Sequence, residues 1–100
     1  MKTKIYIADI NSTINEKFNN VTLLYPHAQK DSTKPNCLST IITEGSAYII
    51  IATTDDKDIK SFKDWDSAAE YANSLTSGNY NIGIRQAGKM TYTTAATINA

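Results

Sequence analysis

The chain is poor in the side chains that form covalent or metal cross-links in small proteins. It has one cysteine, Cys37, and one histidine, His27, in 100 residues. A single cysteine excludes an intramolecular disulfide and any zinc site built from several cysteines. We therefore expect Cys37 to be a reduced packing residue of a cytoplasmic protein, and we expect the fold to depend on its hydrophobic core.

Glycine-rich motifs and long apolar runs are also missing. The four glycines form neither a dinucleotide-binding motif nor a phosphate-binding loop. The longest apolar run, 47–52, is far shorter than the roughly 20 residues that span a membrane. Asp9 interrupts the apolar stretch near the basic start of the chain, so that start is unlike a signal peptide. We expect neither nucleotide hydrolysis by these motifs, nor a membrane span, nor secretion.

Neither sign of charge dominates, because ten basic side chains balance ten acidic ones. Zero net charge argues against a protein held on nucleic acid by bulk charge, and equally against an acidic mimic of DNA. The chain is instead rich in threonine, asparagine and serine, with 13, 9 and 8 residues. Threonine suits strands that face water, and asparagine and serine suit turns and helix ends.

The first quarter of the chain mixes strand and helix patterns. The expected elements are a strand over 4–10, a short helix over 13–19 and a strand over 21–25. Thr13 and Glu16 have the spacing of a capping box, which places the start of the helix. One longer helix over 13–25 is the alternative, because apolar residues continue at helical spacing.

Two hairpins flank the clearest helix. The expected elements are a hairpin over 37–54 that turns at 44–46, an amphipathic helix over 65–76, and a hairpin over 80–98. Asp64 is placed to cap the helix, and Trp65 is expected to anchor it in the core. The run 49–51 is apolar on both faces, which is typical of a central strand.

These elements predict a single α+β domain over residues 1–100. Its two layers are a mainly antiparallel sheet of about four to five strands and one covering helix, 65–76. In the last hairpin, alternation places Tyr80, Met90 and Tyr92 on the apolar face that packs against the core.

Catalytic patterns are weak. His27 and Cys37 lie ten residues apart in a polar segment, at no spacing typical of a nucleophile and its base. The cluster Asp55, Asp56 and Asp58 fails the calcium-loop pattern and fits a solvated turn after a strand. We therefore assign no catalytic, cofactor-binding or metal-binding residue, and we expect no cofactor. If the chain were an enzyme, the best candidates would be His27, Cys37 and Asp55.

The function that remains is binding. We expect a small non-catalytic protein that occupies a protein or protein complex, as phage or mobile-element inhibitors of host defence do, for example those of the anti-CRISPR type. The composition, with nine lysines but one arginine, is typical of AT-rich genomes of this kind. The expected contact residues lie in the loop 25–36 and the last hairpin. They are Tyr25, His27, Lys30, Lys34, Asn36, Arg85 and Lys89.

Two other functions stay open. One is a small-ligand or nucleotide-binding homo-oligomer, since exposed strand edges favour self-association. The other, less favoured, is a weak nucleic-acid-binding module. The sequence leaves the oligomeric state open between monomer and homodimer, and it indicates no membrane partner.

Overall fold

The computed structural model describes residues 2–31, 33–35, 37–43, 47–86 and 88–100. The elements in these ranges are β1 (Lys2–Tyr6), α1 (Ile7–Lys17), β2 (Val21–Leu23), β3 (Ser39–Thr43), β4 (Ala47–Thr53), β5 (Ile59–Phe62), α2 (Trp65–Asn73), β6 (Asn79–Gln86) and β7 (Thr93–Asn99). The α+β class and the mainly antiparallel sheet are confirmed.

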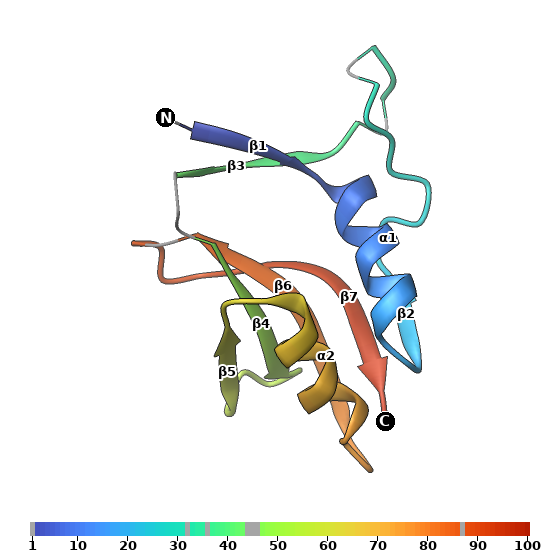
Figure 1. Ribbon diagram of the computed structural model, residues 1–100, viewed down its shortest axis with the longest axis vertical. Coiled ribbons are helices and arrows are strands. Elements are labelled where there is room, and N and C mark those ends of the chain that lie inside the picture. The colour runs from blue at the N-terminus through green and yellow to red at the C-terminus, as the bar shows by residue number, and fades with distance from the viewer. Residues whose placement is uncertain (1, 32, 36, 44–46, 87) are drawn as a thin grey trace.

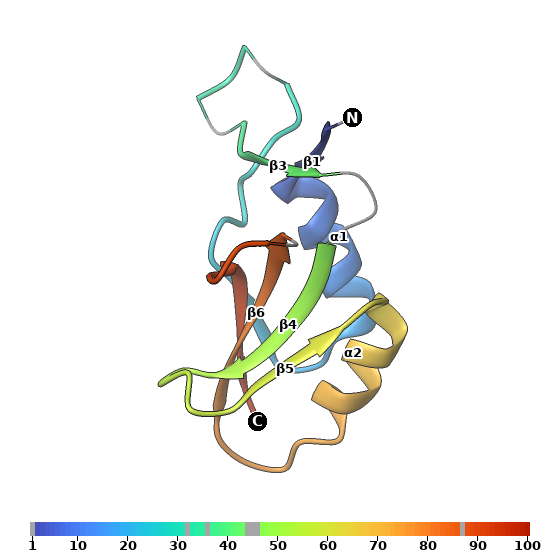
Figure 2. The ribbon, with the colours of Figure 1, turned by 90° about the vertical axis from the view of Figure 1, so that its left-hand side faces the viewer.

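The main layer is a five-stranded antiparallel sheet in the order β2-β7-β6-β4-β5. Figures 1 and 2 show α1 and α2 together on one face of this sheet. Two helices therefore cover the sheet, where the sequence led us to expect one. The pair β1 and β3 forms a separate two-stranded antiparallel sheet at the end of the molecule beside the start of α1.

The core lies between the five-stranded sheet and the two helices. Ile49 and Ile51 of β4 pair across the sheet with Ile84 and Ile82 of β6, and all four are buried on the helix side. The helices meet them with Ile7, Ile10, Ile14 and Phe18 from α1 and Ala68, Ala69 and Ala72 from α2. Small alanines on α2 let this short helix approach the sheet closely.

The hairpin expected over 37–54 is wrong. β3 pairs with β1, while β4 pairs with β5 on one side and β6 on the other. Because the apolar β4 has both edges occupied, no edge is left for β3. The expected turn at 44–46 lies outside the described residues. The hairpin expected over 80–98 is confirmed as β6 and β7.

The first helix begins earlier than expected. The segment 4–10 is a strand only as far as Tyr6, and α1 runs from Ile7 to Lys17 instead of over 13–19. Thr13 lies within the helix, where its hydroxyl donates to the Asp9 carbonyl at 3.3 Å, so the expected capping box is wrong. The helix ends before Asn20, whose φ of 57° is left-handed, and the short strand β2 follows. The expectation of a helix followed by a strand is thus confirmed in kind, and the alternative of one longer helix is wrong.

The second helix starts where the sequence indicates. The Asp64 carboxylate accepts a hydrogen bond from the Ser67 backbone N–H at 2.7 Å and caps α2. The helix stops at Asn73, three residues before the expected end. The Asn73 side chain donates to the Lys17 carbonyl at 2.9 Å and so ties the ends of the two helices together. Trp65 packs on the core and makes an edge-to-face contact with Phe18.

The last strand differs from the expected alternation. The pairing of β6 with β7 shifts register between Ile82 and Gly83. The strand β7 itself begins only at Thr93. Tyr80 packs on the core as expected, but Met90 is 97% exposed. No helix in the described part of the chain is both long and apolar enough to cross a membrane.

Candidate functional site

The five-stranded sheet has a second side, which we call the outer face: the side opposite α1 and α2. Side chains alternate along each strand, so Asn81 and Gly83 of β6 point to the outer face while Ile82 and Ile84 point to the helices. Gly83 marks the centre of this face, where it pairs with Ile50 of β4.

Tyr92 lies on the outer face, and its expected place on the apolar core face is wrong. A Cβ added to Gly83 would lie 2.6 Å from Cδ2 of the Tyr92 ring. The ring therefore packs directly on the glycine, on the side away from Ile82 and Ile84. Period-two alternation fails here because Tyr92 precedes β7 and the strand pairing shifts register nearby.

The Tyr92 hydroxyl is held between two side chains. It donates to Asp56 Oδ1 at 2.6 Å, and it accepts from Asn81 Nδ2 at 3.3 Å. Asp56 follows β4 in a turn and has a φ of 58°, a left-handed conformation in which asparagine and aspartate are the least costly side chains. The hydroxyl of Tyr92, a residue that precedes β7, thus links the turn after β4 to the strand β6.

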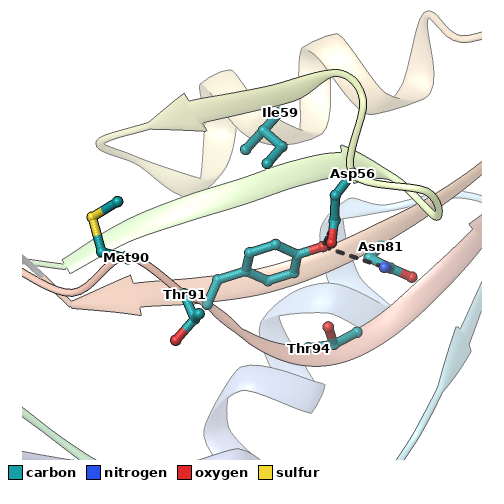
Figure 3. A pocket seen from close by; sticks show the side chains of 7 residues that line it. Asp56, Ile59, Asn81, Met90, Thr91 and Thr94 are labelled. Carbon is teal, nitrogen blue, oxygen red and sulfur yellow. Dashed lines mark hydrogen bonds between the residues drawn. The ribbon is translucent and has the colours of Figure 1, made fainter.

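This arrangement borders a cavity of about 310 Å³, which we call the outer cavity (Figure 3). Its lining residues are Asp56, Ile59, Asn81, Met90, Thr91, Tyr92 and Thr94. Figure 3 shows Asp56 and Asn81 on one side of the cavity and Met90 on the other. The carboxylate and the amide thus stand at one end of the cavity, and the flexible apolar side chain of Met90 stands at the opposite end.

Two apolar residues at the outer cavity are unusually exposed for their type. Met90 is 97% exposed and Ile59, on the edge strand β5, is 49% exposed. Single exposed apolar side chains are ordinary, but two that line one cavity together with a tyrosine are typical of a contact surface.

The local environment also affects the Tyr92 hydroxyl. Burial of the phenol, together with its hydrogen bond to the Asp56 carboxylate, raises the Tyr92 pKa above the ordinary value of 10.0. The hydroxyl therefore stays protonated at neutral pH and acts as a hydrogen-bond donor.

The loop favoured by the sequence forms a separate surface. Tyr25 is 42% exposed, and its carbonyl accepts from the buried Asn11 side chain at 2.8 Å. Tyr25 and the exposed His27 line a shallow cavity of about 230 Å³. Lys30 is exposed, 3.3 Å from Asp9 and 5.7 Å from the centre of the Tyr6 ring.

The remaining expected contact residues are divided between two places. Lys34 is exposed in the same loop, where its backbone N–H donates to Asp31, and Asn36 lies outside the described residues. Arg85 and Lys89 belong to the β6–β7 hairpin. The Arg85 guanidinium lies 4.8 Å from the centre of the Tyr48 ring and donates to the Lys89 carbonyl at 3.3 Å. Their partner-binding roles stay predictions.

The weak catalytic candidates are not brought together. Among the residues that the structure places, His27 and Cys37 share no hydrogen bond. Asp55 accepts from the Thr53 hydroxyl at 2.7 Å and from the Lys57 backbone, bonds that lower its pKa and fit a turn. Within the described side chains no group of three or more His, Cys, Asp or Glu is arranged to hold a metal ion.

Sequence reasoning missed the residues of the outer cavity. The sequence pattern indicates a solvated turn at Asp56 and core positions for Tyr92 and Met90, whereas all three side chains line this cavity. A scan against protein-family models, a search of curated proteins and a search of solved structures each find no match to this chain.

Proposed function

We propose that this chain is a small non-catalytic binding protein that acts by occupying a macromolecular partner, and that the outer face is its contact surface. The observation that carries the proposal is the pair of exposed apolar side chains, Met90 and Ile59, beside a cavity in which hydrogen bonds hold the Tyr92 hydroxyl.

Preorganisation supports this choice of surface. Tyr92 is held by the Gly83 backbone on one side and by Asp56 and Asn81 at its hydroxyl. A side chain that is already fixed loses little entropy on binding, so more of the contact energy remains as affinity. Tyrosine is also enriched among the residues that dominate binding energies.

The surface includes one of the two regions that the sequence indicated. The β6–β7 hairpin ends beside the outer cavity and carries Arg85 and Lys89. Most of the described residues of the loop 25–36 lie beyond the sheet, beside β1 and β3 (Figures 1 and 2), while Tyr25 at its start lines a cavity together with Thr93 of β7. We propose the hairpin end as the primary contact and leave the loop as a secondary one.

Capture experiments with matched variants test the proposal. Met90→Asp adds a charge at a position that is 97% exposed, and Asn15→Asp adds the same charge on the exposed side of α1. A partner captured by the wild type and by Asn15→Asp, but not by Met90→Asp, supports the proposed surface. A partner retained equally by both variants contradicts it. If the partner is a component of a host defence system, the finer proposal of a phage or mobile-element inhibitor is supported.

A small-ligand-binding protein is the second candidate, because the outer cavity has about the smallest volume of an ordinary ligand site. Native mass spectrometry of the purified chain distinguishes it. A bound small molecule that is lost on denaturation supports this candidate, and an empty chain that still binds a protein partner rejects it.

A further inference from the structure

The outer cavity has the chemistry of a site for a positive charge. We propose that it receives a cationic side chain, an arginine or a lysine, of the partner protein. This inference rests on the proposed function, since it names the group that the partner inserts.

The Asp56 carboxylate provides the charge. Its Oδ1 accepts from the neutral Tyr92 hydroxyl at 2.6 Å, which leaves its negative charge uncompensated. Among the side chains that the structure places, no lysine or arginine lies within ion-pair distance of Asp56. Lys57 follows Asp56 directly in the chain but forms no ion pair with it, while Lys60 lies 3.7 Å from Asp58 and Arg85 lies over the Tyr48 ring.

The rest of the lining fits the stem and head of such a side chain. Arginine and lysine combine an apolar stem with a charged end, and Met90 and Ile59 offer apolar surface for the stem. The Tyr92 ring offers a π-system for the cation beside the Asp56 carboxylate. Thr91 and Thr94 add hydroxyl oxygens that can accept from a guanidinium or ammonium group.

Other occupants fit less well. An anion would meet the Asp56 carboxylate at close range, which is repulsive. A purely apolar group would remove water from that carboxylate without replacing its hydrogen bonds, which is costly. A cation avoids both penalties and forms a charge-assisted hydrogen bond.

The variant Asp56→Asn removes the charge and little else. Asparagine tolerates the left-handed φ of 58° at this position, and its side-chain oxygen can still accept from the Tyr92 hydroxyl. Asp58→Asn is the matched control, because it removes the same charge from the same turn at a residue outside the cavity lining.

The experiment is a titration followed by amide NMR spectra, with N-acetyl-arginine amide as probe and the neutral isostere N-acetyl-citrulline amide as its control. We expect the arginine probe to shift the amide signals of residues 56, 81 and 92–94. We expect Asp56→Asn to weaken that binding about tenfold, the usual effect of losing one charge-assisted hydrogen bond. Asp58→Asn should bind like the wild type, and the same spectra show that each variant is folded.

Several results would overturn the inference: no binding of the arginine probe, equal binding of the citrulline probe, shifts confined to other residues, or equal losses in Asp56→Asn and Asp58→Asn. Failure of the proposed function looks different. A partner that depends on Met90 while the probe does not bind keeps the proposed function and rejects the cationic occupant. Probe binding at Asp56 with partner capture insensitive to Met90→Asp keeps the site and rejects the proposed function.

Discussion

Gly83 is the position where the smallest substitution should have a large effect. A Cβ added there would lie 2.5 Å from the Thr93 carbonyl oxygen, 2.6 Å from Tyr92 Cδ2 and 3.1 Å from the Thr93 carbonyl carbon. Two of these three atoms belong to the backbone of β7, which cannot rotate away as a side chain can. In Gly83→Ala either β7 moves away from β6 or Tyr92 leaves its place, and both changes disturb the centre of the sheet.

We expect Gly83→Ala to lower the free energy of unfolding by about 2 kcal/mol, the middle of the range for a group inserted into a packed site. For a domain of this size, that corresponds to a fall in Tm of about 8–16 °C. Circular dichroism during heating measures the shift, and urea unfolding gives the free energy.

The control is Gly88→Ala, where an added Cβ has no atom within 4 Å but φ is 81°. Its cost comes from the left-handed backbone alone, about 1 kcal/mol. If Gly83→Ala is as stable as the wild type, or less harmful than Gly88→Ala, the close packing of Tyr92 and β7 on Gly83 is wrong.

Three further predictions concern the core, the acid range and the tyrosine. Ile14→Ala should lower the free energy of unfolding by about 3 kcal/mol in urea, because Ile14 is fully buried between α1 and the sheet. Hydrogen bonds at the first turn of α2 lower the Asp64 pKa below 3.8, so its stabilising effect is present above about pH 4 and is lost as the pH falls through the lowered pKa. Urea unfolding between pH 7 and pH 2 should therefore show a smaller loss in Asp64→Asn, whose amide oxygen keeps the cap without titrating, and an equal loss would contradict this account. Asp56→Asn should lower the Tyr92 pKa, because the carboxylate no longer opposes ionisation of the phenol. The measurement is the ultraviolet titration step that Tyr92→Phe removes, and an unchanged step would mean that the two side chains do not interact.

Local signals in the sequence were reliable where one element decides its own structure. Asp64 begins α2 because its carboxylate can reach the backbone N–H of Ser67, three residues later in the chain. This contact needs no distant partner. The run 49–51 indicated a central strand because apolar groups on both faces must be covered. These features therefore followed from the sequence.

The sequence patterns predicted the wrong structure where packing or pairing with a distant segment determines it. Ile7 fits a strand by its spacing from Ile5 and a helix by its spacing from Ile10, and packing of α1 on the sheet selects the helix. β3 pairs with β1, which is more than 30 residues away, so no local turn could reveal the pairing.

The candidate site was hidden for the same reason. Tyr92 and Asp56 are 36 residues apart and meet only after β4, β6 and β7 pair. A pattern of alternation assigned Tyr92 to the core, because a register shift in β7 cannot be read from residue types. Gly83, a glycine in the interior of an expected strand, is the hint in the sequence that another group approaches the backbone closely.

The central claim is that the outer face contacts a macromolecular partner. Amide hydrogen exchange, measured on the chain alone and in complex with a partner that it captures, tests this claim most directly. We predict that the exposed segments 54–59 and 88–92, which border the outer cavity, exchange more slowly in the complex. Slower exchange confined to α1, α2 or the loop 25–35, with these two segments unchanged, would contradict the claim.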